Sequence, residues 1–99
     1  METEAREHQD PEKVLRLRSR ALDWLPVGEE IVALDQERDL YLGANKSAAT
    51  LWQTLVDGAT RSQLIDLLVS TFDIDTDQAG LDVDAFIGSL SEHQLLEKP

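Results

Sequence analysis

The chain has 99 residues, 41% of them hydrophobic, and its 9 Lys and Arg against 20 Asp and Glu give a net charge of −11. A chain of this length can bury a core of its own. The negative charge argues against nucleic acid or an anionic membrane surface as a partner, since both require a positive contact surface. The absence of Cys excludes disulfides, a thiolate nucleophile and Cys-ligated metals.

The first twelve residues are acidic and nearly devoid of apolar side chains. Such a segment cannot bury enough surface to offset the entropy lost on ordering. We therefore predict a disordered acidic tail over residues 1–12 and one folded domain over residues 13–99. No apolar run approaches the ~18–20 residues that span a bilayer, and the N-terminus has no apolar signal-peptide region. The sequence thus predicts a soluble, cytoplasmic protein.

The first half of the domain has the pattern of β-strands. Leu and Arg alternate over residues 14–20, which predicts a first strand with its arginines on a solvated face. Pro26 and Gly28 predict a loop over residues 21–28. Residues 31–34 form a short apolar run, typical of a second, buried strand.

A polar turn without Gly follows at residues 35–39, and Leu40 to Leu42 complete a hairpin that Gly43 ends. We therefore expect three antiparallel strands before any helix.

The second half has helical periodicity. Asn45 is a plausible N-cap for a first helix that ends at Asp57-Gly58. Thr60 and Gln63 match a capping box for a second helix, and a third is expected to start near Asp75. Apolar residues recur at helical spacing in the first and third of these, at Ala48, Leu51, Trp52 and Leu55 and at Val83, Phe86, Ile87 and Leu90. The predicted fold is α+β and winged-helix-like, with a three-stranded sheet followed by three helices.

Carboxylates at residues 73, 75 and 77 resemble the opening of an EF-hand calcium loop. The pattern then departs from that loop, because Gln78 replaces the required Gly and Asp84 the bidentate Glu. Helix capping by these Asp residues explains the pattern more simply. We expect no metal site here and no cofactor.

Catalysis has no support in the sequence. His8 lies in the tail and His93 near the end of the last helix, too isolated for a metal cluster or a catalytic triad. We therefore expect no catalytic residue.

A winged-helix fold also suggests a DNA-binding regulator. Its reading helix, residues 75–92, would carry five carboxylates and no Lys or Arg, the wrong charge for a groove lined by phosphates.

A binding module is the remaining class. A small sheet has exposed edges, and an edge strand at residues 40–42 could accept an extended peptide by strand addition. The alternative is that Leu40 and Leu42 belong to the core and Tyr41 covers the surface. Periodicity alone favours that alternative.

The ordered series from Val32 through Leu40-Tyr41-Leu42, Asn45, Trp52 and Thr60 to Leu95-Leu96 resembles the PqqD-like family (coenzyme PQQ synthesis protein D), also called RiPP recognition elements. The resemblance spans about residues 14–97. It implies a non-catalytic protein that holds the leader segment of a ribosomally synthesised precursor peptide for a separate modifying enzyme. It places the leader as an added strand between the third strand and the third helix.

By position, the resemblance assigns peptide binding to residues on both sides of that groove. The strand side comprises Arg38, Asp39, Leu40, Tyr41 and Leu42. The helix side comprises Val83, Asp84, Ile87 and Gly88, where Gly88 would allow another backbone to approach. Periodicity does not determine which face of this helix lines the groove.

The chain departs from the family pattern at three places: Ala44 replaces a larger Leu, the turn at residues 36–39 lacks Gly, and Gln94 replaces a Gly before the final Leu pair. A separate chain of this size most resembles the recognition proteins of lasso-peptide pathways, whose partner is a leader peptidase. A peptide chaperone for a radical-SAM enzyme, as in the PQQ pathway, is the alternative within the family.

Overall fold

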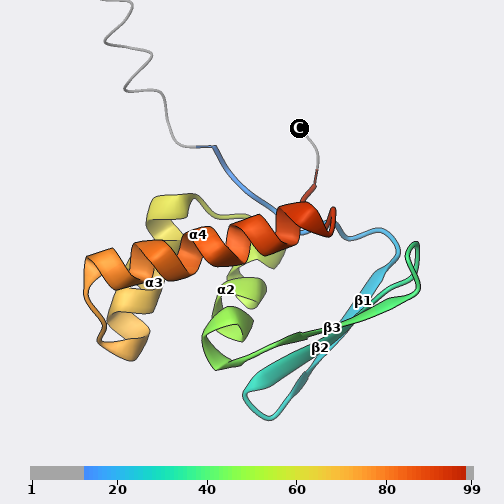
Figure 1. The fold of residues 1–99 in the computed structure, drawn as a ribbon, viewed down its shortest axis with the longest axis horizontal. Helices are drawn as coiled ribbons and strands as arrows, with labels where there is room; N and C mark the ends of the chain where they lie inside the picture. The colour runs from blue at the N-terminus through green and yellow to red at the C-terminus, as the bar shows by residue number, and fades with distance from the viewer. Residues whose placement is uncertain (1–12, 98–99) are drawn as a thin grey trace, which may run out of the picture.

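A computed structural model describes residues 13–97, so the predicted tail of residues 1–12 lies outside the described part. Its elements are β1 (Leu22–Val27), β2 (Glu30–Asp35), β3 (Leu40–Ala44), α2 (Lys46–Asp57), α3 (Arg61–Phe72) and α4 (Thr76–Glu92). The strands are antiparallel in the order β1-β2-β3, which makes β2 central and β1 and β3 the two edges (Figure 1). The predicted fold class is confirmed.

The first strand lies later in the chain than the sequence predicts. Residues 22–27, predicted as a loop, form β1, whereas residues 14–20 make only two isolated bridges, Leu15 to Ala59 and Leu17 to Leu96. Pro26 is compatible with a strand here because β1 is an edge, where one side needs no main-chain donor. The Leu–Arg alternation therefore marks a segment that packs along the helices and does not join the sheet.

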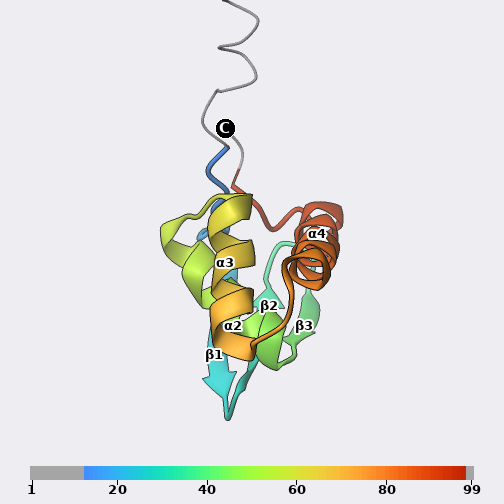
Figure 2. The ribbon, with the colours of Figure 1, turned by 90° about the vertical axis from the view of Figure 1, so that its left-hand side faces the viewer.

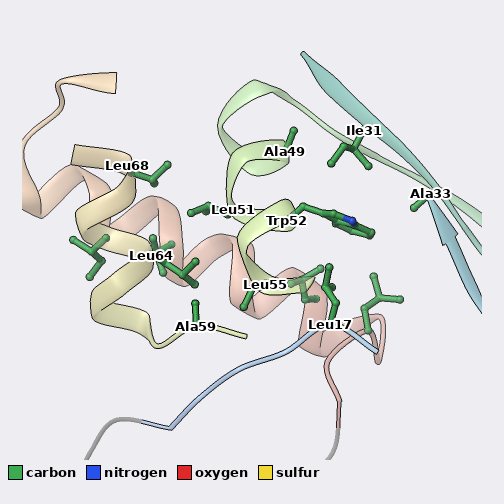
Figure 3. Close-up of a cluster of buried hydrophobic side chains, with 14 of the residues drawn as sticks. Leu17, Ile31, Ala33, Ala49, Leu51, Trp52, Leu55, Ala59, Leu64 and Leu68 are labelled. Carbon is green, nitrogen blue, oxygen red and sulfur yellow. The ribbon is translucent and has the colours of Figure 1, made fainter. Parts of the chain in front are cut away.

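The helices cover one face of the sheet and leave the other uncovered (Figures 1 and 2). On the covered face, Ile31 and Ala33 of β2 are buried, and Trp52 of α2 lies against them (Figure 3). Trp24 of β1 meets Trp52 edge-on, with ring centroids 6.2 Å apart. Burial of each large apolar side chain contributes roughly 1.5–3 kcal/mol, so this layer fixes the sheet on α2.

The predicted caps begin the helices. Asn45 accepts a hydrogen bond from the Ala48 amide, Thr60 and Gln63 form the full capping box, and Asp75 caps α4 by accepting from the Gln78 amide. The middle carboxylate of the calcium-like pattern thus acts as a helix cap. Each such cap contributes about 1 kcal/mol.

One arginine of the N-terminal segment is not solvated as predicted. Arg18 has a side chain only 14% exposed, and its Nη2 donates to Oδ1 of the fully buried Asp35 at 2.7 Å. The Glu37 amide donates to the same oxygen at 3.1 Å. Burial raises the pKa of Asp35, but the Arg18 hydrogen bond and charge and the amides of Glu37 and Arg38 together lower it below its usual value. This ion pair ties the N-terminal segment to the end of β2.

At two of the three departures from the family pattern, the main chain adopts a conformation that favours Gly. Asp39, in the turn that lacks Gly, has φ 56°, and Gln94 has φ 59°, so both adopt the left-handed conformation that Gly adopts most easily. β3 does not end at Gly43 as predicted but continues to Ala44. In the described residues 13–97, no helix is long and apolar enough to cross a membrane.

Candidate functional site: the groove between β3 and α4

The direction of the main-chain groups on β3 follows from the sheet register. The two-residue turn Gly28-Glu29 joins Val27 to Glu30, which makes those two a hydrogen-bonded pair. Such pairs recur at every second residue, and the Gln36 amide continues the series by donating to the Ala21 carbonyl at 2.8 Å. The intervening β2 residues therefore turn their main chain toward β3.

Those β2 residues are Ile31, Ala33 and Asp35, and they lie opposite Ala44, Leu42 and Leu40 of β3. The amides and carbonyls of Tyr41 and Gly43 consequently point away from the sheet. No segment within residues 13–97 pairs with them. The predicted edge at residues 40–42 is confirmed, and it is open on the side toward α4 (Figure 2).

A groove of about 380 Å³ lies between this edge and α4. The large apolar residues that line it are Leu42, Leu51, Trp52, Phe86, Leu90 and Leu95. An extended chain at the β3 edge could place alternate side chains into this groove while its main chain pairs with the strand.

Polar groups surround the apolar lining of the groove. Asn45, Ser47, Asp82, Ser89 and His93 all contribute to it. Asp82 carries the only negative charge among the lining residues, and its Oδ1 accepts from Gln78 Nε2 at 2.9 Å. The groove can therefore hold an apolar side chain with a cationic group beside it.

Asp84 faces away from the groove although it lies only two residues from Asp82. Its two carboxylate oxygens accept from Arg61 Nε at 2.7 Å and Arg61 Nη2 at 3.0 Å. This hydrogen bond and the Arg61 charge lower the pKa of Asp84 despite partial desolvation. Asp84 thus joins α3 to α4.

The helix-side residues expected from the family resemblance lie outside the groove lining. Val83 is fully buried in the core, and Asp84 pairs with α3. Ile87 packs against the core and does not line the groove. Gly88 is exposed, and a Cβ there would meet open space, so nothing in the described chain approaches it closely.

On the strand side, Leu42 lines the groove and Leu40 is half-buried, while the Tyr41 side chain is 73% exposed on the opposite face. Arg38 and Asp39 lie in the β2–β3 turn. The structure therefore brings β3 and α4 together at one groove, but the α4 residues that line it are the sequence neighbours of the expected ones. This face of α4 consists of Asp82, Ala85, Phe86, Ser89 and Leu90, together with the C-cap residue His93.

Only part of this face had a signal in the sequence. Phe86 and Leu90 belong to the apolar period that predicted the helix, but the polar residues between them look like any solvated helix face. The distinction requires the position of α3, whose Arg61 and Ile65 lie against the Gly80 and Asp84 side of α4. This packing turns Asp82 and Phe86 toward β3.

A family comparison supports the significance of this site. The family model of coenzyme PQQ synthesis protein D (PqqD) matches residues 30–96. This range runs from the start of β2 through the end of α4 to Leu96. This range includes both walls of the groove. No curated protein sequence matches the chain at a significant level.

Two solved structures share the fold. Lasso peptide synthetase B1 complexed with the leader peptide has a TM-score of 0.73 and 26% identity, covering 85% of this chain and 98% of that one. TbiB1 in complex with the TbiA(beta) leader peptide has a TM-score of 0.76 and 21% identity, covering 85% of this chain and 96% of that one. At its lower identity, TbiB1 is evidence for the fold alone.

Proposed function

This chain belongs to the PqqD family, and we propose that it is a non-catalytic recognition protein that binds the leader segment of a ribosomally synthesised precursor peptide. The leader adds as a strand along β3. The observation that carries the proposal is the open β3 edge, whose Tyr41 and Gly43 main-chain groups point toward a groove with an apolar lining. Main-chain pairing supplies affinity, and the groove supplies specificity.

The proposed contacts divide between main chain and side chains. On the strand side, Arg38 and Asp39 of the β2–β3 turn and Leu40 of β3 lie along the path of the leader. Tyr41 pairs with the leader through its main chain, and Leu42 contacts its side chains. On α4, we propose Asp82 and Phe86 as contact residues in place of Val83, Asp84, Ile87 and Gly88, because only the former pair lines the groove.

The charge of the groove favours a leader with a basic residue. Asp82 lines the groove and makes no ion pair within the described residues, whereas Asp84 already forms an ion pair with Arg61. A Lys or Arg next to the leader's apolar anchor would lie close to Asp82. The net charge of −11 adds a long-range attraction to such a peptide.

We further propose that the captured leader is passed to a separate leader peptidase in lasso-peptide biosynthesis. The support is the similarity to lasso peptide synthetase B1, which was solved with a leader peptide. The description of the family model as a PQQ synthesis protein favours a second candidate, a peptide chaperone for a radical-SAM enzyme. The two candidates share the peptide-binding step and differ in the enzyme that follows it.

The test is a fluorescence anisotropy titration of a labelled lasso-precursor leader peptide, such as the one bound to lasso peptide synthetase B1. Wild-type protein should bind the labelled leader and ignore a scrambled peptide of the same composition. Tyr41→Pro, which removes an outward donor only, should lose binding while its circular dichroism and melting temperature stay near wild type. Full affinity in folded Tyr41→Pro, or retardation of random duplex DNA at low salt in place of peptide binding, would contradict the proposal.

A further inference from the structure

The face of the sheet that the helices leave uncovered is apolar. Leu25 and Val27 of β1 are 57% and 53% exposed, Val32 of β2 is 42% exposed, and Tyr41 of β3 is 73% exposed. A sheet face that only meets water is normally polar. These side chains therefore form a surface, here called the outer sheet face, whose composition solvent contact does not explain.

The register shows that the outer sheet face is continuous. Leu25 lies directly opposite Val32, and Val32 lies opposite Gly43, so these three residues form one row across all three strands. The adjacent row contains Leu34 opposite Tyr41. Side chains opposite each other in a row are about 5 Å apart, and the two rows are roughly 7 Å apart along the strands. Their apolar side chains therefore form one patch, with Asp23 of β1 at the end of the second row.

Neither the backbone conformation nor the packing within the described chain requires a glycine at position 43. Its φ is not positive, and a Cβ added to it would meet nothing within 4 Å. Glycine within a strand costs stability and often marks close approach of another chain. At this position it leaves the β3 main chain uncovered opposite Val32.

The charged residues at the outward positions of the strands are all acidic. The outward positions of the three strands also include Asp23 and Glu30, and none of these positions carries a basic residue. Asp23 accepts a hydrogen bond from Gln36, and Glu30 makes no ion pair within residues 13–97. The surface presented to a partner is thus an apolar centre with acidic groups at the β1–β2 side.

This charge selects among the possible occupants. A second copy would carry the same −11 charge and, in a symmetric contact, the same acidic groups against this face. Residues 1–12 of the chain are themselves acidic, with one Arg against five carboxylates. An anionic membrane is repelled for the same reason. Complementarity instead requires a surface with an apolar centre and a rim of Lys or Arg.

We propose that the outer sheet face docks a folded protein whose contact surface has an apolar centre and a rim of Lys or Arg. This protein is the enzyme to which the captured leader is passed. The inference rests on the proposed function, since it assigns the enzyme's place relative to the leader. β3 connects the two surfaces: the Tyr41 side chain belongs to the outer sheet face, and the Tyr41 main chain belongs to the open edge. An enzyme on this face would therefore lie beside the bound leader.

The experiment uses the 99-residue chain, a labelled leader peptide, and a purified leader peptidase of a lasso-peptide pathway, the enzyme proposed above as the partner. Enzyme binding is measured by isothermal titration calorimetry with the leader at saturation. The double variant Leu25→Ser/Val32→Ser removes the apolar centre, and Glu30→Lys reverses the charge without touching the core. Leu81→Ser is the matched control, because Leu81 is 67% exposed on α4, away from the sheet.

We expect the double variant to bind the enzyme at least tenfold more weakly, Glu30→Lys several-fold more weakly, and Leu81→Ser as well as wild type. Leader affinity should be unchanged in all three. Unchanged enzyme binding in both folded test variants would overturn the inference. So would dimerisation of the wild type that the double variant abolishes, or a gain in enzyme affinity on deleting residues 1–12.

This design distinguishes failure of the proposed leader binding from failure of the proposed docking surface. If the leader does not bind but the enzyme still requires Leu25 and Val32, the proposed function fails and the docking surface stands. If the leader binds and the enzyme ignores the outer sheet face, the proposed function stands and the docking surface fails.

Discussion

The two edge strands flank the same central strand, yet they present different edges to their surroundings. β1 carries Pro26 at a position where the main chain points away from β2, so one outward donor is missing. β3 has Tyr41 and Gly43 at its outward positions, and both keep their amides. We therefore expect β1 to resist strand addition and β3 to accept it, with Pro26 as the residue that makes the difference.

The largest effect is expected from the Arg18–Asp35 pair, which holds the N-terminal segment against the strand that both edges share. Arg18→Met would leave the fully buried Asp35 carboxylate without its cation. Breaking a buried pair from one side costs about 3 kcal/mol or more. Urea unfolding should show this loss, and Asp35→Asn should lose less, because Arg18 keeps its ion pair with Glu37 at 3.0 Å. An equal or smaller loss in Arg18→Met would refute this role.

The same pair predicts acid sensitivity. Because the folded-state pKa of Asp35 is lowered, its stabilisation is present above the unfolded-state pKa and disappears as the pH falls through the folded value. The unfolding free energy of the wild type should therefore fall below about pH 4. Asp35→Asn should show a shallower fall, and identical acid profiles for the two proteins would contradict the assignment.

The second prediction compares how readily the β1 and β3 edges pair with another chain. Pro26→Ala restores an outward donor on β1 and should make that edge available for pairing. We expect a higher dimer fraction by analytical ultracentrifugation and unchanged affinity for the leader. Tyr41→Pro closes the β3 edge and should show the reverse pattern: no added dimer and at least tenfold weaker leader binding. Equal peptide affinity in the two variants would erase the distinction between the edges.

The two hairpins that attach these edges predict a third, smaller effect. Gly28 of the β1–β2 turn and Asp39 of the β2–β3 turn both have φ near +60°. Gly28→Ala should destabilise the chain by about 1 kcal/mol, because it forces a Cβ into the left-handed region. Asp39→Gly should stabilise it by only a few tenths, since Asp tolerates this conformation. Thermal unfolding of both variants measures the difference, and a stabilising Gly28→Ala would contradict it.

The smallest effect concerns two neighbouring acids of α4. Asp82→Asn should weaken binding of a leader that contains Lys or Arg by about threefold, as expected for a single exposed ion pair. Asp84→Asn is the control, because Asp84 pairs with Arg61 and does not line the groove. The Asp82 effect should vanish at about 500 mM salt. Equal losses in the two variants would remove Asp82 from the site.

Most of the architecture could be predicted because its signals are local. Asn45, Thr60 with Gln63, and Asp75 cap helices through neighbours three residues away, so the sequence alone shows where the helices begin. The position of β1 could not be predicted in this way. Pro26 is a loop signal unless its strand is known to be an edge, and that depends on the pairing of distant segments.

The candidate site was predictable to the same extent. The edge at Leu40–Leu42 follows from a local hairpin pattern, whereas the groove face of α4 depends on how α3 rotates that helix. Val83 and Asp82 are adjacent in sequence, yet one is fully buried and the other lines the groove. Similarly, nothing near Arg18 in the sequence identifies Asp35, 17 residues away, as its partner.

Amide hydrogen exchange at β3, measured by NMR with and without the leader, tests the central claim most directly. Without the peptide, Leu40 and Leu42 should exchange slowly, because they bond to β2, and Tyr41 and Gly43 should exchange fast. The leader should protect Tyr41 and Gly43 and leave the outward residues of β1 unchanged. Leader binding that leaves Tyr41 and Gly43 unprotected, or that protects β1 instead, would contradict strand addition at β3.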